Sequence, residues 1–187
     1  MRFLIALLAL APALALAAPG KADLTGEAKF VSEAPVEKIV GTAETTGTLD
    51  IDLDALEGLK ATLKVPVASM KTGNDQRDEH LRSDTWLDAA KFPEITFETT
   101  AVKITKPTSG AEIKEAEVEV TGKFTLHGVT TDITAPATLK WKENKLKITT
   151  KFQVKLADYQ IKGRDGVVGS KVGTNIDLEV TLKGEVK

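Results

Sequence analysis

The stretch MKTGNDQRDEHLRSDTWLDAAKFPEITF, residues 70–97, decides the fold because it interrupts an otherwise uniform pattern of strands. On both sides of it, apolar residues recur at every second position between threonines, lysines and glutamates, which is the spacing of a strand with one buried face. Within it, Asn74 or Asp75 can cap a helix by accepting a hydrogen bond from a free backbone amide, and Pro93 ends the segment. We therefore expect one helical insertion near residues 75–90.

The alternation predicts about eight strands, with a ninth near residue 174 if residues 158–169 form a loop. Polar residues fill the intervening positions, so each strand has one wet face, which is typical of an antiparallel sheet. Short connections at residues 127–129 and 143–145 fit β-hairpins. The eight predicted strands begin near residues 23, 37, 45, 59, 94, 115, 131 and 145.

A water-soluble barrel with an apolar interior fits this pattern better than an outer-membrane barrel does. An outer-membrane barrel needs aromatic girdles at both membrane interfaces. Aromatic residues make up only 5% of the chain, and they belong to the alternating apolar set. Small residues at inward positions would leave volume unfilled, and an eight-stranded barrel can hold one ligand. The alternative is a two-sheet sandwich whose facing sheet fills those gaps. The small inward residues are Ala61, Thr99, Gly122, Ala135, Ala137 and Thr150.

The first residues have the pattern of a cleaved signal peptide, residues 1–17, followed by one domain, residues 18–187. Arg2 precedes an apolar run, and Ala15-Leu16-Ala17 has the small-x-small pattern of a cleavage site. The competing interpretation, an uncleaved anchor, is disfavoured because Pro12 breaks an already short apolar run. We therefore expect an exported protein with no membrane span in its mature chain.

Composition excludes some partners. The mature chain carries a net charge of about −3, which offers no basic face for nucleic acid. The chain has no cysteine, so there is no disulfide framework or thiolate metal site, and the core must supply the stability. Exposed strand edges would allow a homodimer.

Little in the sequence indicates catalysis or a cofactor. Only His80 and His127 could act as imidazole ligands or bases, and no spacing supplies the three or four ligands of a zinc site. We expect no metal site, because His80 has only Asp78 and Glu79 beside it. We expect His127, which ends a strand before Gly128, to hydrogen-bond its own turn. No G-x-S-x-G elbow is present.

Three blocks together resemble a known family. VPVASMKTGNDQRDEHLRSDTWLDAAKFPEITFETT, VTGKFTLHGVTTDIT and DGVVGSKVGTNIDLEVTL occur in this order and span most of the mature chain. They are similar to the YceI-like family of exported lipid-binding proteins. The resemblance implies a lipocalin-like antiparallel barrel with a packed helix, a long polyisoprenoid or similar amphiphile in an apolar tunnel, a periplasmic location, and no shared catalytic residues or cofactor.

On this basis we expect two sets of site residues. The inward apolar set would line the tunnel: Phe97, Phe124, Leu126, Leu139, Trp141, Phe152, Val154, Ile176 and Leu178. The insertion would form either a plug that closes one barrel end or a lid over the cavity, and the glycine-rich loop at residues 158–173 could bring cations to a ligand's phosphate. The lid and mouth residues would be Arg77, His80, Leu81, Arg82, Trp86, Leu87 and Arg164.

The function expected from the sequence is periplasmic binding of an isoprenoid or fatty amphiphile, for carriage or sequestration. One alternative is a lipid-modifying isomerase or hydrolase that uses His80 or His127 inside the barrel. The other is a structural or stress-response interaction protein whose core is filled by its own side chains. Overpacking a filled core costs about 1–3 kcal/mol, so enlarging Gly122 or Ala137 would separate a filled barrel from a hollow one.

Overall fold

The computed structural model describes residues 20–34, 36–162 and 171–187. The expected signal peptide, residues 1–17, and Arg164 lie outside the described residues. Within them, no helix is long and apolar enough to cross a membrane.

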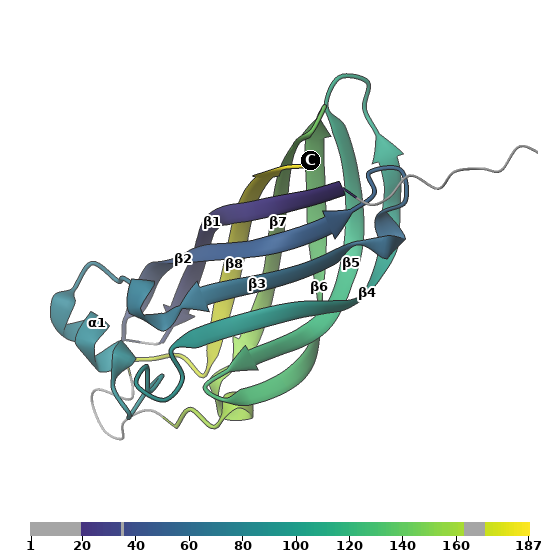
Figure 1. Cartoon of the computed structure of the whole chain (residues 1–187). Coiled ribbons are helices and arrows are strands. Elements are labelled where there is room, and N and C mark those ends of the chain that lie inside the picture. Colours follow the sequence, from purple (N-terminus) through teal and green to yellow (C-terminus); the bar gives the residue numbers. More distant parts are fainter. Residues whose placement is uncertain (1–19, 35, 163–170) are drawn as a thin grey trace, which may run out of the picture.

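Eight antiparallel strands form one closed barrel in which each strand pairs with its sequence neighbour and β8 pairs with β1 (Figure 1). The predicted all-β barrel with one helical insertion is thereby confirmed. The strands are β1 (Gly20–Glu33), β2 (Lys38–Ile51), β3 (Lys60–Pro66), β4 (Glu94–Ser109), β5 (Lys114–Leu126), β6 (Val129–Lys142), β7 (Lys145–Lys155) and β8 (Asn175–Glu185).

One predicted strand break was wrong, while the strand expected near residue 174 is present, so the count remains eight. The segments that begin near residues 37 and 45 are a single strand, β2, because its pairing with β1 runs without a break from Lys38 to Ile51. The ninth segment, near residue 174, is β8. Strand β4 continues through bulges to Ser109.

Ring closure decides between the two architectures that the sequence left open. A sandwich has two separate sheets with edges, whereas here the pairing of Thr25–Ser32 with Ile176–Lys183 joins the first strand to the last. Pairing of β1 with β8 removes the first and last strand edges on which the expected homodimer rested, and dimer formation itself stays a prediction.

The barrel is sealed unevenly between β6 and β7. These strands pair only from Ala137 to Lys142, and Pro136, which has no amide hydrogen to donate, lies directly before the paired part. The 3-10 helix η3 (Leu156–Tyr159) lies beside the unpaired part of β6, where the Tyr159 hydroxyl is 2.7 Å from the Thr131 hydroxyl. Tyr159 is 3% exposed, so this side chain helps to close the wall where the ladder ends.

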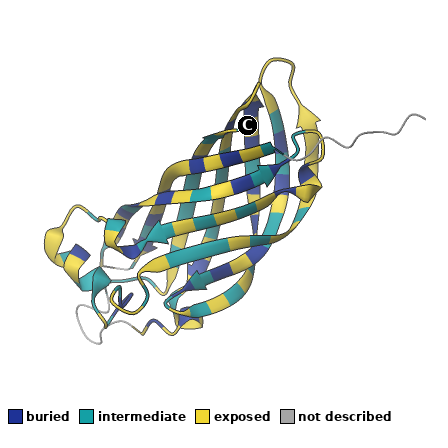
Figure 2. Ribbon diagram, viewed as in Figure 1, coloured by how far each residue is buried: buried dark blue, intermediate teal, exposed yellow. Residues whose placement is uncertain are grey.

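Two apolar clusters occupy the two ends of the barrel, and buried residues alternate with exposed ones along the strands (Figure 2). The closed-end cluster is built mainly from leucines and Trp141. The mouth cluster contains aromatic residues and part of the insertion. The principal members of the closed-end cluster are Leu24, Leu49, Ile51, Leu56, Leu139, Trp141 and Leu182, and those of the mouth cluster are Phe30, Val67, Met70, Trp86, Leu87, Phe124, Val154 and Tyr159.

The insertion contains one short helix, α1 (Asp75–Arg82), at the mouth end of the barrel (Figure 1). Asn74 caps it as expected, since its side chain accepts a hydrogen bond of 3.0 Å from the Arg77 amide. The helix is shorter than the predicted 75–90 because Ser83 takes an extended conformation and its hydroxyl donates to the His80 carbonyl, 2.7 Å away. Turns carry the chain from there to β4.

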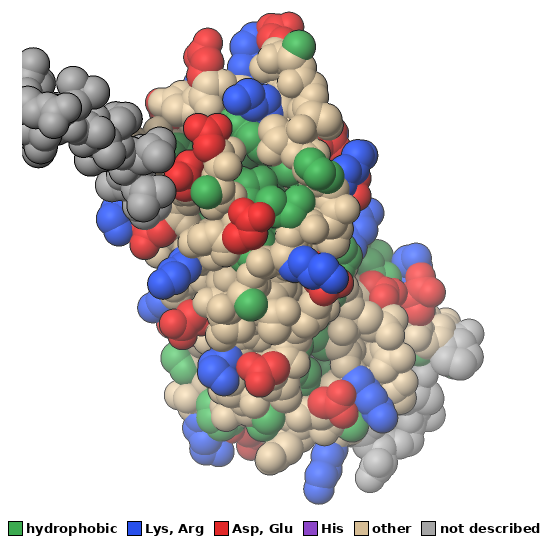
Figure 3. Space-filling view, turned by 90° about the vertical axis from the view of Figure 1, so that its right-hand side faces the viewer, with side chains coloured by type: hydrophobic (Ala, Val, Ile, Leu, Met, Phe, Trp, Pro, Cys, Tyr) green, Lys and Arg blue, Asp and Glu red, His purple; other side chains and the backbone are tan. Residues whose placement is uncertain are grey.

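Charges on the outside of the barrel are mixed, and Figure 3 shows acidic and basic side chains interspersed over one face. Outward lysines pair with carboxylates across neighbouring strands, as Lys106 does with Glu117 and Lys151 with Glu179. The charged side chains on the exposed face of each strand are therefore solvated, and the candidate binding site lies in the interior of the barrel.

Gly122 does not leave the gap that the sequence suggested. A Cβ atom at this position would lie 2.4 Å from the Glu98 carbonyl oxygen and 2.4 Å from Cζ of Phe97. The Phe97 ring therefore packs directly over the Gly122 backbone. A glycine is needed because the opposite strand and this ring approach too closely for any side chain.

We predict that Gly122→Ala lowers the free energy of unfolding by about 1–3 kcal/mol through overpacking. Gly58→Ala is the matched control, because a Cβ atom there meets nothing within 4 Å, and we expect its effect to stay within about 0.5 kcal/mol. Urea unfolding followed by tryptophan fluorescence measures both changes. Equal stability of the two variants would contradict the close packing of Phe97 on Gly122.

Candidate functional site: two chambers behind one mouth

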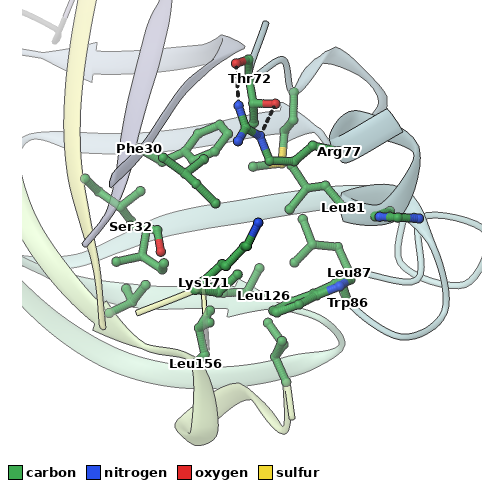
Figure 4. Close-up of a pocket in the computed structure, with 18 of the residues that line it drawn as sticks. Phe30, Ser32, Thr72, Arg77, Leu81, Trp86, Leu87, Leu126, Leu156 and Lys171 are labelled. Atoms are coloured by element: carbon green, nitrogen blue, oxygen red, sulfur yellow. Dashed lines mark hydrogen bonds between the residues drawn. The ribbon is translucent and has the colours of Figure 1, made fainter. Parts of the chain in front are cut away.

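The main cavity is an outer chamber of about 520 Å³ at the end of the barrel that carries α1 (Figure 4). Its walls come from β1, β2, β4, β5, β7 and β8, and its roof comes from the insertion. The lining is mostly apolar, with polar side chains gathered toward α1. Its principal apolar lining residues are Phe30, Ile39, Met70, Leu81, Trp86, Leu87, Leu126, Leu156, Val172 and Leu178.

A smaller inner chamber of about 110 Å³ lies deeper in the barrel. Five of the six predicted small residues line it, which confirms their inward position: Ala61, Thr99, Ala135, Ala137 and Thr150. The Thr99 hydroxyl accepts from the Ala61 amide, and the Thr150 hydroxyl donates to the Pro136 carbonyl. Thr45 also lines this chamber, and its buried hydroxyl oxygen has no hydrogen-bond partner among the described residues. Most of the other lining side chains are apolar, and this makes the chamber suited to hydrocarbon.

Two side chains, Ile95 and Phe124, line both chambers and so mark the boundary between them. The Phe124 ring meets the rings of Phe152 and Tyr159 edge to face, with centroids 5.8 Å and 5.6 Å apart. These contacts fix the orientation of Phe124. A tail that enters the inner chamber must pass this aromatic cluster.

The structure brings eight of the nine predicted tunnel residues to the chambers. Phe124, Leu126, Val154, Ile176 and Leu178 line the outer chamber, and Phe97, Phe124, Leu139 and Phe152 line the inner one. Trp141 lies elsewhere, because it is two residues beyond Leu139 toward the closed end, where it is 3% exposed and packs in the closed-end cluster.

Five of the seven predicted lid and mouth residues line the outer chamber: Arg77, His80, Leu81, Trp86 and Leu87. Trp86 and Leu87 are buried, at 9% and 6% exposure, and they form part of the roof. Arg82 instead points its guanidinium to the Met70 carbonyl, 3.4 Å away, and does not line the chamber. Arg164 lies outside the described residues.

Sequence reasoning missed several wall residues at the start of the barrel, notably Phe30, Ile39 and Glu37. The signal for Phe30 was available, because Leu24, Ala28, Phe30 and Ser32 share one parity along β1. No local pattern could identify Glu37, since its importance arises only when the β1–β2 connection meets α1.

A hydrogen-bond network orders the polar side of the mouth. The buried Asp78 carboxylate accepts from the amide and the hydroxyl of Thr72, at 2.8 Å and 2.6 Å. Arg77 in turn donates from Nε to the Thr72 hydroxyl and from Nη1 to the Glu37 carboxylate, at 2.9 Å and 2.7 Å. The network thereby ties α1 to the connection between β1 and β2.

His127 makes a different contact from the one predicted. It sits with Gly128 in the two-residue turn between β5 and β6, where both residues have positive φ, 51° and 74°, as a type I′ hairpin turn requires. Its Nδ1 lies 3.1 Å from the Tyr159 carbonyl oxygen, and its ring meets the Phe92 ring edge to face, so it bonds η3 and not its own turn. Within the described residues, no three His, Asp or Glu side chains gather in a way that could hold a metal.

One ion pair secures the segment behind the roof. Lys91 Nζ lies 2.8 Å from the Asp88 carboxylate. Its hydrogen bond lowers the pKa of Asp88 below 3.8, and the same bond raises the pKa of Lys91 above 10.5. Asp88 also accepts the Phe92 and Lys91 amides on its carbonyl oxygen, so the pair holds together the turn that follows Trp86 and Leu87.

The family model of the YceI-like domain matches residues 23–184. The chain is 33% identical over 184 residues to the UPF0312 protein of Pseudomonas syringae pv. tomato, with 92% of this chain and 89% of the relative covered. It is 30% identical over 177 residues to Protein YceI of Escherichia coli O6:H1, with 88% and 87% covered.

Solved structures share the fold. BcnA of Burkholderia cenocepacia superimposes with a TM-score of 0.72 at 19% identity, covering 84% of this chain and 95% of that one. A polyisoprenoid binding domain from Saccharophagus degradans gives 0.69 at 16% identity, covering 90% and 99%.

We predict that Asp78→Ala destabilises the protein by about 1–3 kcal/mol, because it removes a buried carboxylate and leaves two half-buried donors of Thr72 without their acceptor. Glu79→Ala is the control on the same helix, since Glu79 is exposed, and its effect should stay within about 0.5 kcal/mol. Chemical denaturation compares the two. A loss no larger for Asp78→Ala than for Glu79→Ala would show that the network does not hold the insertion.

We predict a pH-dependent stability difference between the parent and Lys91→Met. The lowered pKa of Asp88 makes the pair stabilising above pH 3.8, and this contribution is lost as the pH falls through the folded-state pKa. The raised pKa of Lys91 makes the contribution fully present below pH 10.5 and lost as the pH rises through the higher folded-state pKa. Thermal unfolding across pH should therefore show a gap near neutrality that closes at both extremes. Lys103→Met, on the exposed face of β4, should show no such dependence.

Proposed function

Because the chain belongs to the YceI-like family, we propose that it binds one long-chain amphiphile, a polyisoprenoid or a similar molecule, with its tail in the two chambers and its polar end at the mouth. The observation that carries this proposal is the pair of adjoining apolar chambers, of which the outer one has a polar rim beside α1. The Saccharophagus degradans protein of the same fold is a polyisoprenoid binding domain, and this supports an isoprenoid tail.

The energetics require a long tail. Burial contributes about 0.8 kcal/mol for each methylene removed from water, while association costs an estimated 4–15 kcal/mol. A tail of about four methylenes contributes only ~3 kcal/mol and cannot offset that cost. A tail that fills both chambers can. Affinity should therefore rise with chain length until the inner chamber is full.

We infer that the protein carries or sequesters its ligand in the periplasm. The signal-peptide pattern at residues 1–17 and the exported family that the sequence resembles support that location. A barrel that shields the tail from water suits either task, because a long apolar chain does not cross an aqueous compartment unaided.

The arrangement of the histidines supports binding over lipid modification. His127 is engaged by the Tyr159 carbonyl and the Phe92 ring and lines neither described chamber. His80 lies in the outer chamber wall beside polar residues of α1. Replacing both histidines by glutamine should accordingly leave lipid uptake intact, and loss of a turnover present in the parent would favour the enzyme.

Native mass spectrometry of the protein purified from its own exported compartment tests the proposal. We expect a mass increment from one bound amphiphile, and tandem fragmentation identifies it. A ligand-free mass, together with no uptake of added prenyl or fatty amphiphiles, would refute the proposed function.

We predict that Ala137→Leu blocks the inner chamber while the fold survives. Ala137 lines that chamber, so the larger side chain fills open space and costs less than the 1–3 kcal/mol or so of an overpacked core. Binding of long tails should weaken, and binding of short tails that stay in the outer chamber should not. Ala101→Leu, on the exposed face of β4, is the control and should change neither. Strong destabilisation by Ala137→Leu would instead indicate a filled core.

A further inference from the structure

The mouth of the outer chamber places one carboxylate between two cations. Glu37 Oε1 accepts from Arg77 Nη1 at 2.7 Å, and Glu37 Oε2 lies 3.9 Å from Lys171 Nζ. All three residues line the chamber, and Figure 4 shows the Lys171 side chain reaching into it among apolar residues. The three side chains come from separate parts of the chain, namely the β1–β2 connection, α1 and the approach to β8.

The guanidinium of Arg77 is held in place before any ligand arrives. Nε donates to the Thr72 hydroxyl at 2.9 Å and Nη2 donates to the Thr72 carbonyl at 3.2 Å. Thr72 is fixed by Asp78, which is 6% exposed. A rigid guanidinium with donors directed at the chamber rim is suited to carboxylate or phosphate oxygens.

Both cations have capacity beyond Glu37. A guanidinium has five N–H donors, and the described contacts of Arg77 use three of them. The 3.9 Å separation between Lys171 and Glu37 is an ion pair but is too long for a hydrogen bond. The trio carries a net charge of +1. The buried Asp78 carboxylate behind Thr72 offsets part of this charge. At the rim itself two cations face one carboxylate, and Glu37 occupies the position that an anionic ligand would take.

We propose that the Arg77–Lys171 pair is the binding site for an anionic head group, a phosphate or a carboxylate, on the amphiphile, and that Glu37 competes with this head group for the same donors. The proposal rests on the proposed function, because the tail must occupy the chambers for its head to reach the rim. An incoming head group replaces Glu37 on Nη1 of Arg77 and gains the ammonium of Lys171. Glu37 then turns to solvent, where it is already half exposed.

The test compares two probes with one tail, farnesyl phosphate and farnesol, by displacement of a fluorescent fatty probe. Lys171→Gln should lower the affinity for farnesyl phosphate about fivefold, because one partly screened charge contact is lost. Glu37→Gln should raise the affinity for farnesyl phosphate by a similar factor, because the competing carboxylate is gone. Neither substitution should change farnesol binding. Raising the salt concentration should weaken the binding of farnesyl phosphate but not that of farnesol, since exposed charges are screened within about 10 Å at 0.1 M.

The matched controls are Lys38→Gln and Glu33→Gln. They remove a cation and a carboxylate that pair with each other on the same β1–β2 hairpin but lie outside the chamber lining. Both should leave the two affinities unchanged. Inorganic phosphate added alone should not displace the fluorescent probe, and displacement by it would show a site for the free ion in place of a head-group site.

Equal affinities for farnesyl phosphate and farnesol that neither Glu37→Gln nor Lys171→Gln changes would overturn the anionic-head proposal and leave lipid binding standing. If the substitutions changed the affinity for farnesol as much as that for farnesyl phosphate, the anionic-head proposal would also be overturned. Such a result would show that the two substitutions alter the mouth as a whole. Failure of both probes to bind would instead count against the proposed function.

Discussion

The structure depends on a ring of antiparallel strands whose inward side chains are too small to meet across its middle. Near the closed end, Leu49, Ile51 and Trp141 pack in one buried cluster and line neither chamber. In the middle, alanines and threonines stand in the same parity, and open space remains. Such space normally reduces stability, because its lining loses dispersion contacts. The closed ring of backbone hydrogen bonds holds the walls apart in spite of that loss.

Closure of the wall at the mouth needs elements that are not strands. The β6–β7 ladder stops at Ala137, and η3 lies against β6 beyond it through Tyr159. The insertion is anchored at its base by hydrogen bonds between Thr42 and Lys71 and by the Val67 amide, which donates to the Pro93 carbonyl. Trp86 and Leu87 can therefore form a roof without strand pairing. At the mouth, side-chain contacts therefore hold the wall together where backbone strand pairing ends.

The sequence predicts the barrel well because a period of two acts locally. Each strand shows its inward face in its own residues, and the small inward residues at 61, 135 and 137 correctly indicated a cavity. Gly122 looked identical in the pattern, yet the Phe97 ring fills the space beside it. Whether a small residue leaves a gap depends on a neighbour across the ladder, and alternation along one strand does not contain that information.

The candidate site was predictable in part for the same reason. Its apolar lining follows from parity, so eight of the nine chosen tunnel residues reach a chamber. Trp141 shares their parity but lies too far along the barrel axis, a coordinate that periodicity does not supply. The loop at residues 158–173, which contains Lys171, was expected to bring cations to the mouth. Its pairing with Glu37 was beyond local reasoning, because 134 positions separate the two residues in the chain and only closure of β8 onto β1 brings them together.

The apolar chambers and the charged rim contribute differently to ligand recognition. The chambers offer apolar surface that accepts any tail of suitable length and width, so tail burial supplies affinity with little discrimination among head groups. The rim offers few contacts, but they are charged and fixed by Asp78 and Thr72. A partly exposed charge contact adds little to total affinity. It can still decide between two ligands with the same tail, because their tail contributions are equal and cancel in the comparison.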